Sequence, residues 1–180
     1  MGFQIDSVYH LYNRGNNREP IFFAEESYRF FTEKMHKYFL KHQVELIAYC
    51  LMPNHFHIVV RQRAPNQISK ALQGLMTSYV KAMNIRHHRV GHLFQGRVQS
   101  RLVETELYCI NLVRYLHLNP VVAGLVRQPD AWQHSDYRRW ILNSEIQLRD
   151  QLIGNGKEYA SFVADSLDIA CLHAFDEFKD

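Results

Sequence analysis

The stretch L-I-A-Y-C-L-M-P-N-H-F-H-I-V-V-R, residues 46 to 61, decides the fold of this chain. Two apolar, β-prone runs flank Pro53 and Asn54, and a two-residue break of this kind predicts a tight hairpin turn. Side chains alternate along a strand, so His55, His57 and Arg61 share one face of the second strand. The two histidine backbones lie about 7 Å apart, which allows both imidazoles to bind one small ion. A half-exposed histidine pair without a ligand is the alternative.

The composition indicates one globular domain. The chain has 180 residues, of which 47% are hydrophobic and 13% aromatic, enough to bury a core without cross-links. Three widely separated cysteines, Cys50, Cys109 and Cys171, suggest neither a disulfide framework nor a zinc ribbon. The sequence begins without a signal segment and has no apolar run of membrane-spanning length. We therefore expect a soluble, cytoplasmic protein with no membrane partner.

Charge is distributed unevenly, although the net charge is only +3. No Asp or Glu occurs between Leu46 and Val103, whereas this stretch contains eight Arg or Lys residues and five histidines. From Asn143 onward eight acidic residues accompany three basic ones. A basic middle predicts a polyanionic partner. Chance clustering on a solvated face is the alternative.

The remaining periodicities predict the order strand, helix, strand, strand, helix, strand, helix. We expect strands at 7–14 and 92–103, the latter bulged at Gly96, and helices at 25–42 and 67–86. Thr105 fits the N-cap of a third helix, which Pro120 is expected to end. This order is typical of an α+β fold with a ferredoxin-like, split βαβ antiparallel sheet and helices on one face. The third helix and a helical C-terminal tail are additions to it.

The third predicted helix places Tyr108, Asn111, Tyr115 and Asn119 along one stripe. Tyr115 and Asn119 are four positions apart and so neighbours in space. Asn119 offers a carbonyl oxygen that suits a hard cation, and Tyr115 offers a phenol beside it. Taken alone, the pattern is better explained by an amphipathic helix whose tyrosines pack and whose Asn119 caps the end.

Together these motifs resemble the HUH single-strand tyrosine transposases, and most closely the REP-associated tyrosine transposases, which act on repetitive extragenic palindromes. The matching segments are H-F-H after the P-N turn, Y-L-H-L-N-P at 115–120, L-F-Q-G-R at 93–97 and H-L-Y-N-R-G-N-N-R at 10–18. The resemblance covers roughly Asp6 to Trp140. We expect a catalytic domain at 1–127 and a helical C-terminal extension of unassigned role at 128–180.

The resemblance implies a metal-dependent endonuclease and strand transferase that acts on single-stranded DNA bearing a hairpin. Residues corresponding to His55, His57 and Asn119 hold one divalent ion in the family, Mg²⁺ or Mn²⁺, which polarises the scissile phosphate. Tyr115 corresponds to the nucleophile that forms a 5′-phosphotyrosine and frees a 3′-hydroxyl. From the charge pattern, the expected DNA contacts are Asn13, Arg14, Arg18, Arg61, Arg97 and Arg101.

Other functions and assemblies remain open. A ferredoxin-like sheet can be a nucleic-acid-binding module without catalysis, although the RNA-binding strand motif of that class is missing from the sequence. An HUH replication or mobilisation nickase uses the same chemistry in larger proteins, and a zinc-binding structural protein is a third possibility. We expect a monomer that acts in cis, because the short link before the third helix limits its reach. A homodimer is the alternative.

Overall fold

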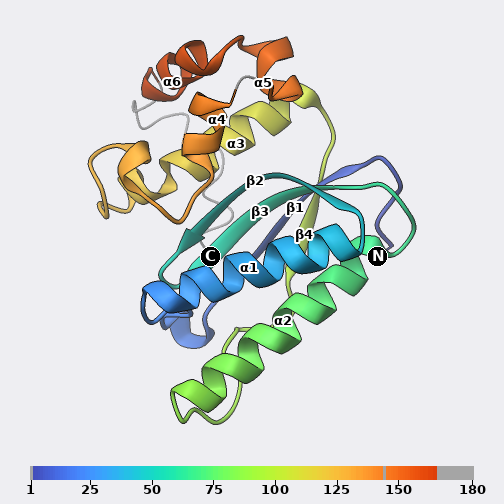
Figure 1. Ribbon diagram of the computed structural model, residues 1–180, viewed down its shortest axis with the longest axis vertical. Coiled ribbons are helices and arrows are strands. Elements are labelled where there is room, and N and C mark those ends of the chain that lie inside the picture. Colours follow the sequence, from blue (N-terminus) through green and yellow to red (C-terminus); the bar gives the residue numbers. More distant parts are fainter. Residues whose placement is uncertain (1, 144, 166–180) are drawn as a thin grey trace. The chain divides into compact units, whose positions relative to one another are not determined.

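The computed structural model describes residues 2–143 and 145–165 and divides the chain into two compact units (Figure 1). The first unit comprises Met1–Ile47 and Leu51–Leu102, and the second comprises Ala48–Cys50 and Val103–Asp180. Part of the acidic C-terminal segment lies outside the described residues. Its members there are Asp168, Asp176, Glu177 and Asp180, together with Cys171.

A four-stranded sheet forms the framework of the first unit, with the strand order β2-β3-β1-β4. Its strands are β1 (Val8–Arg14), β2 (Val44–Met52), β3 (His55–Gln62) and β4 (Gln99–Val103). β1 and β3 pair in antiparallel register, with Leu11 opposite Ile58. Each helix of this unit crosses between two strands, as in a split βαβ arrangement. The predicted α+β, ferredoxin-like fold class is therefore confirmed.

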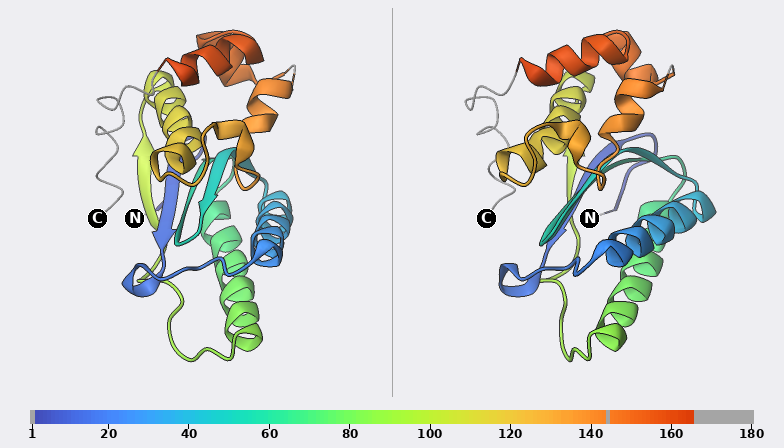
Figure 2. Two further views of the ribbon diagram at one scale, coloured as in Figure 1. Left: turned by 90° about the vertical axis from the view of Figure 1, so that its left-hand side faces the viewer. Right: turned by 60° about the vertical axis from the view of Figure 1, so that its left-hand side comes forward.

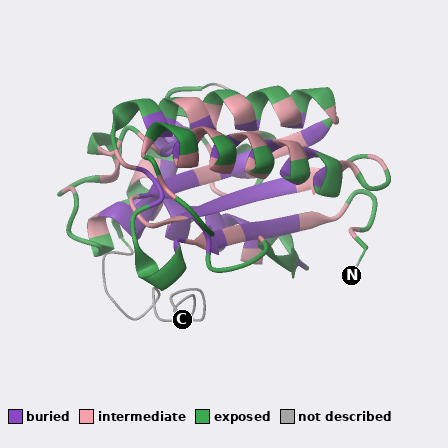
Figure 3. Cartoon of the chain, turned by 90° about the horizontal axis from the view of Figure 1, so that it is seen from below, coloured by how far each residue is buried: buried purple, intermediate pink, exposed green. Residues whose placement is uncertain are grey.

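Two helices cover one face of this sheet, as Figure 2 shows from two further sides. They are α1 (Glu25–Lys41) and α2 (Gln67–Arg86). Phe31 of α1 has its ring centroid 5.3 Å from that of Phe56 on β3 and 4.9 Å from that of Tyr79 on α2. Phe31 therefore belongs to the core between the helices and the sheet, and Figure 3 shows the buried strands beneath the half-exposed helices.

The predicted hairpin turn joins β2 to β3 through Pro53 and Asn54. The carbonyl of Pro53 accepts hydrogen bonds from the backbone N–H groups of Ile21 and Phe22, at 2.9 and 3.1 Å. The carbonyl of Asn54 accepts one from Gly15 N–H at 2.7 Å. The segment that follows β1 therefore fixes the turn that begins the histidine strand. This segment includes the short 3₁₀ helix η1 (Asn16–Arg18).

The second unit is helical apart from Ala48–Cys50, which belong to strand β2, and the predicted helical tail is present through residue 164. Its elements are α3 (Glu106–Val122), η2 (Pro129–Ala131), α4 (Tyr137–Leu142), α5 (Gln147–Leu152) and α6 (Gly156–Ala164). Arg149, only 1% exposed, donates to the carbonyls of Trp140, Asn143 and Gly154 and pairs with Asp150. This arginine fastens the end of α4 to the α5–α6 connection.

Two sequence predictions differ from the structure. The strand expected at 92–103 is confined to Gln99–Val103, and the segment before it forms only an isolated bridge between Gly15 and Phe94. Leu93 and Phe94 are both buried, whereas a strand packed on one face buries alternate residues.

The second difference is that α3 does not end at Pro120 but continues to Val122. Proline removes only its own N–H, and the helix is extended by Ala123 N–H, which donates to the carbonyl of Asn119 at 2.9 Å. The predicted beginning is confirmed, since Thr105 accepts a hydrogen bond from Tyr108 N–H at 3.1 Å. The functional boundary at 127 stays a prediction, and the compact units divide at 102 instead.

Candidate active site

One face of the β1–β3 pair gathers the two histidines of the predicted site. Directly opposite residues of antiparallel strands share a face, and Tyr12 lies opposite His57 while Arg14 lies opposite His55. His10, two residues before Tyr12, belongs to the same face. Phe56, which contacts α1, lies on the other side. Within the first unit, the histidine face is therefore the one turned away from α1 and α2.

His55 is held by its neighbour in the turn. Its Nδ1 atom lies 2.7 Å from Oδ1 of Asn54, and its ring centroid lies 5.0 Å from that of His57 at an interplanar angle of 81°. The two imidazoles of the H-F-H motif are therefore adjacent, as two ligands of one ion need to be.

His57 is buried, with 2% of its surface exposed. Burial, aided by the neighbouring His55 and His10, holds the pKa of His57 well below its ordinary value of 6.5. The imidazole is therefore neutral near pH 7. Metal ions bind neutral imidazole, so no proton has to be removed from the ring before it can act as a ligand.

His10 lies behind His57 and is also buried, with 1% exposed. Its Nε2 atom lies 3.0 Å from Nδ1 of His57, and the two rings stack with centroids 5.1 Å apart. Burial, followed by the positive charge of Arg101, lowers the pKa of His10 to about 3. Two neutral imidazoles thus share one hydrogen bond inside the sheet face.

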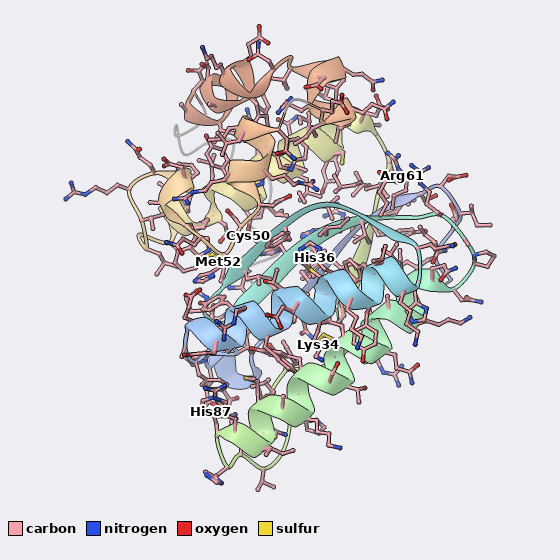
Figure 4. The ribbon with its side chains drawn as sticks, viewed as in Figure 1. Lys34, His36, Cys50, Met52, Arg61 and His87 are labelled. Carbon is pink, nitrogen blue, oxygen red and sulfur yellow. The ribbon has the colours of Figure 1, made fainter. Side chains whose placement is uncertain are left out.

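The six predicted DNA contacts lie in the first unit but in different settings. Arg14 shares the histidine face, and Arg61, labelled in Figure 4, lies near the end of β3 with its Nη1 atom 3.7 Å from Oε1 of Glu45. Asn13 points to the other face and donates from Nδ2 to the carbonyl of Gly96 at 3.0 Å. Three arginines are exposed in η1, in the loop before β4 and in β4 itself. These are Arg18, Arg97 and Arg101.

Tyr115 and Asn119 belong to the second unit and lie one helical turn apart on α3. They are 3% and 7% exposed. The structure thus brings the two histidines together in one unit, and the tyrosine and asparagine together in the other. Positions 112, 113 and 115 to 120 of α3 are all buried, so Tyr115 packs, as the alternative of an amphipathic helix also predicts. Asn119 does not cap the end of the helix, because α3 continues to Val122.

A buried polar network also anchors α3. His117, which is 0% exposed, has its Nδ1 atom 2.7 Å from Oη of Tyr159 on α6. Its ring lies edge-on to that of Trp140, with centroids 5.7 Å apart. The C-terminal helices are therefore built onto the helix that carries Tyr115.

Within residues 2–143 and 145–165, no group of three or more His, Cys, Asp and Glu side chains could hold a metal ion. In the same ranges, no helix is long and apolar enough to cross a membrane.

Sequence reasoning missed His10 and Asn54 as partners of the two histidines. A signal existed for His10, since it alternates with Tyr12 and would share the face of His57 once the first strand is paired with the histidine strand. Asn54 was assigned only to the turn. Its contact with His55 depends on a side-chain rotamer that spacing does not reveal.

Comparison with known proteins places these residues in a family context. The model of the family described as "Transposase IS200 like" matches residues 4–119. This span contains the hairpin, both histidines and α3 as far as Asn119.

The similarity to an individual curated protein is low in sequence identity. A Haemophilus influenzae protein with the assigned name REP-associated tyrosine transposase is 25% identical over 117 residues, covering 59% of this chain and 65% of that protein. The chain thus spans slightly less than two thirds of the length of this curated relative.

Two solved structures are similar. A REP-associated tyrosine transposase bound to a REP hairpin has a TM-score of 0.67 at 17% identity, over 82% of this chain and 86% of that one. A Deinococcus radiodurans protein assigned as a transposase has a TM-score of 0.44 at 17% identity, over 61% and 88%. The first shares the fold described above. The resemblance predicted from the motifs is confirmed, and the chain belongs to the IS200-like transposase family.

Proposed function

We propose that this chain is a REP-associated tyrosine transposase that cleaves and rejoins single-stranded DNA next to a hairpin. The observation that carries the proposal is the family match over residues 4–119, which contains the H-F-H pair and Tyr115 and ends at Asn119. The names of two relatives point to the same class, and one of them was solved with a REP hairpin.

The proposed metal ligands are His55, His57 and Asn119, with Mg²⁺ or Mn²⁺ as the ion. The donor set fits a divalent ion, because it combines two imidazoles, of which that of His57 is neutral near pH 7, with an amide oxygen, and both histidines have their Nδ1 atoms within hydrogen-bond distance of other side chains. When bound, the ion supplies charge that polarises the scissile phosphate.

Tyr115 is the proposed nucleophile. Its Oη atom forms a bond to phosphorus while the bond from phosphorus to the 3′ oxygen breaks, and the departing oxygen takes up a proton as the phenol loses one. The products are a 5′-phosphotyrosine and a DNA strand ending in a 3′-hydroxyl. Because one phosphoester replaces another, attack by a second 3′-hydroxyl can rejoin strands without ATP and release Tyr115.

The proposed substrate is a single strand with a hairpin stem. Arg14, Arg61 and Arg101 are candidates for phosphate contacts around the histidines, and Arg18 and Arg97 for contacts farther along the strand. Asn13 stays a proposed contact, although its amide donates to the carbonyl of Gly96. Phosphate contacts of this kind give affinity that falls with rising salt.

A covalent-adduct assay tests the proposal. The full chain is mixed with labelled, hairpin-bearing single-stranded DNA and Mn²⁺, and the products are separated on a denaturing gel. We expect a DNA–protein band that withstands denaturation, together with a fragment that ends in a 3′-hydroxyl. The same DNA with its stem unpaired by substitution serves as the control. Binding of the hairpin without any adduct or cleaved strand, over a range of REP-like sequences, would favour the non-catalytic binding module instead.

A further inference from the structure

Both histidines of the H-F-H motif have the same ring nitrogen engaged by another side chain of the first unit. Nδ1 of His55 lies 2.7 Å from Oδ1 of Asn54, and Nδ1 of His57 lies 3.0 Å from Nε2 of His10. A neutral imidazole carries its proton on one nitrogen and its lone pair on the other. These two contacts therefore decide which nitrogen of each ring is able to bind an ion.

The chemistry at His55 is settled by its partner. The amide oxygen of Asn54 only accepts hydrogen bonds, so in the neutral ring of His55 Nδ1 carries the proton and Nε2 carries the lone pair. The orientation of the amide is itself fixed, because Asn54 Nδ2 donates to the carbonyl of Arg18 at 3.2 Å.

At His57 the partner is a second imidazole, and two arrangements are chemically possible. If Nε2–H of His10 donates to Nδ1 of His57, the proton of His57 is on Nε2, which then has no lone pair for an ion. If Nδ1–H of His57 donates to Nε2 of His10, the lone pair of His57 is on Nε2, as in His55. Only the second arrangement gives the two histidines matching ligand atoms.

The ring of His10 is held against that of His57 by packing. Its centroid lies 5.1 Å from that of His57 and 5.0 Å from that of Tyr12, and its Nε2 atom stays within hydrogen-bond distance of Nδ1 of His57. His10 is therefore placed to accept the Nδ1 proton of His57.

We propose that His10 is a positioning residue that accepts the Nδ1 proton of His57 and thereby presents Nε2 of His57 to the divalent ion. The inference rests on the proposed function, because it assigns His10 a role in building that metal site. His10 does not touch the ion or the DNA. It acts through His57, in the way that second partners fix the tautomer of metal-binding histidines.

Two variants separate this role from simple packing. His10→Phe keeps an aromatic ring for stacking but removes the acceptor, and His10→Gln restores an amide oxygen that can accept the same hydrogen bond. His92→Phe is the matched control, because His92 is an exposed histidine of the same unit. Circular dichroism establishes that each variant is folded.

The first measurement is the tautomer of His57 in the metal-free full chain, read from ¹⁵N NMR of labelled imidazoles. We expect the proton on Nδ1 in the wild type and in His10→Gln, and a mixture of tautomers in His10→Phe. The second measurement is the affinity for Mn²⁺ alone, without DNA. We expect a loss of about 10- to 100-fold in His10→Phe, recovery in His10→Gln, and no change in His92→Phe.

The possible failures are distinguishable. A wild-type His57 that carries its proton on Nε2 would overturn the inference, and this arm needs no variant to fold. Wild-type affinity for Mn²⁺ in His10→Phe would overturn it too, with the metal site left standing. If the wild type itself bound no Mn²⁺, the metal site of the proposed function would fail, and the role of His10 with it.

Discussion

His117 on α3 and Asp136 at the start of α4 are joined by a buried hydrogen bond, with Nε2 of His117 3.1 Å from Oδ1 of Asp136. The same carboxylate accepts hydrogen bonds from the backbone N–H of Tyr49 at 2.8 Å and from Nε1–H of Trp140 at 3.2 Å. Because a carboxylate only accepts, His117 donates from Nε2, and its Nδ1 atom lies 2.7 Å from the hydroxyl of Tyr159. One side chain therefore organises the polar interior of the second unit.

Replacing Asp136 is expected to destabilise the second unit strongly. Asp136→Ala leaves several buried donors without their acceptor, so the free energy of unfolding should fall by about 3–5 kcal/mol. Asp130→Ala, at an exposed position of η2, is the control and should change it by less than about 0.5 kcal/mol. Urea unfolding followed by tryptophan fluorescence measures both. Equal midpoints for the two variants would show that the network adds little stability.

The assignment of the nucleophile predicts a clean separation of chemistry from binding. Tyr115→Phe removes one oxygen atom, so the covalent adduct should disappear while hairpin binding and thermal stability stay near wild type. Tyr108→Phe, two turns earlier on α3, is the matched control and should retain the adduct. An adduct that survives in Tyr115→Phe and is lost in Tyr108→Phe would transfer the role to Tyr108.

The proposed metal site predicts a loss of cleavage without a loss of affinity for DNA. His55→Ala removes one ligand, and binding of the hairpin rests on phosphate contacts, so only cleavage should fall, by at least about 100-fold. Excess chelator should have the same effect on the wild type, and added Mn²⁺ should reverse it. The readouts are adduct yield and a filter-binding isotherm. Undiminished cleavage in chelator would rule out a metal requirement.

The second unit should lose stability in alkali. Burial, followed by the nearby Asp136 carboxylate, raises the pKa of the Cys50 thiol well above 9.0, and the same two effects raise the pKa of Tyr49 to about 12. Above pH 9 the unfolded chain therefore releases protons that the folded chain keeps.

Each such group lowers the free energy of unfolding by up to about 1.4 kcal/mol per pH unit above its ordinary pKa. The stabilising contribution is complete below pH 9 and declines as the pH rises. Urea midpoints at pH 8, 9 and 10 measure the decline, which should be shallower in Cys50→Ala than in the wild type. Parallel pH profiles for the two proteins would contradict the assignment to Cys50.

The proposed assembly is a monomer whose Tyr115 serves its own histidines. Only Glu104 and Thr105 separate the end of β4 from the start of α3, and a link of this length spans on the order of 10 Å. Tyr115→Phe and His57→Ala proteins should therefore stay inactive when mixed. Recovery of adduct formation in the mixture would mean that two chains share one site, as in the homodimer alternative.

The sequence predicted correctly those features that depend only on neighbouring residues. The Pro53–Asn54 turn, the alternation that pairs His55 with His57, and the Thr105 N-cap each depend on a few consecutive residues. The end of α3 was predicted wrongly, because the rule for proline describes the residues before it and says little about how far a packed helix continues afterwards.

Long-range contacts account for most of what the sequence did not reveal. His10 and His57 are 47 positions apart in the sequence, and their hydrogen bond depends on the register in which β1 and β3 pair. The burial of Arg149 could not be predicted from the sequence, because a charged residue in a polar segment is usually exposed to solvent. In the structure, backbone carbonyls accept the hydrogen bonds of its guanidinium group. Such contacts become predictable only after the fold that creates them is known.

The outer position of β4 in the sheet has a consequence for the protein in concentrated solution. Among the described residues no strand pairs with the second edge of β4, and four of its five residues are exposed. An open edge is a template for strand addition by another chain, and thus for aggregation. The edge here is only five residues long and carries the charged Arg101, and short, charged edges are poor templates for strand addition. The arginine that borders the histidine face therefore also helps to keep copies of this chain apart.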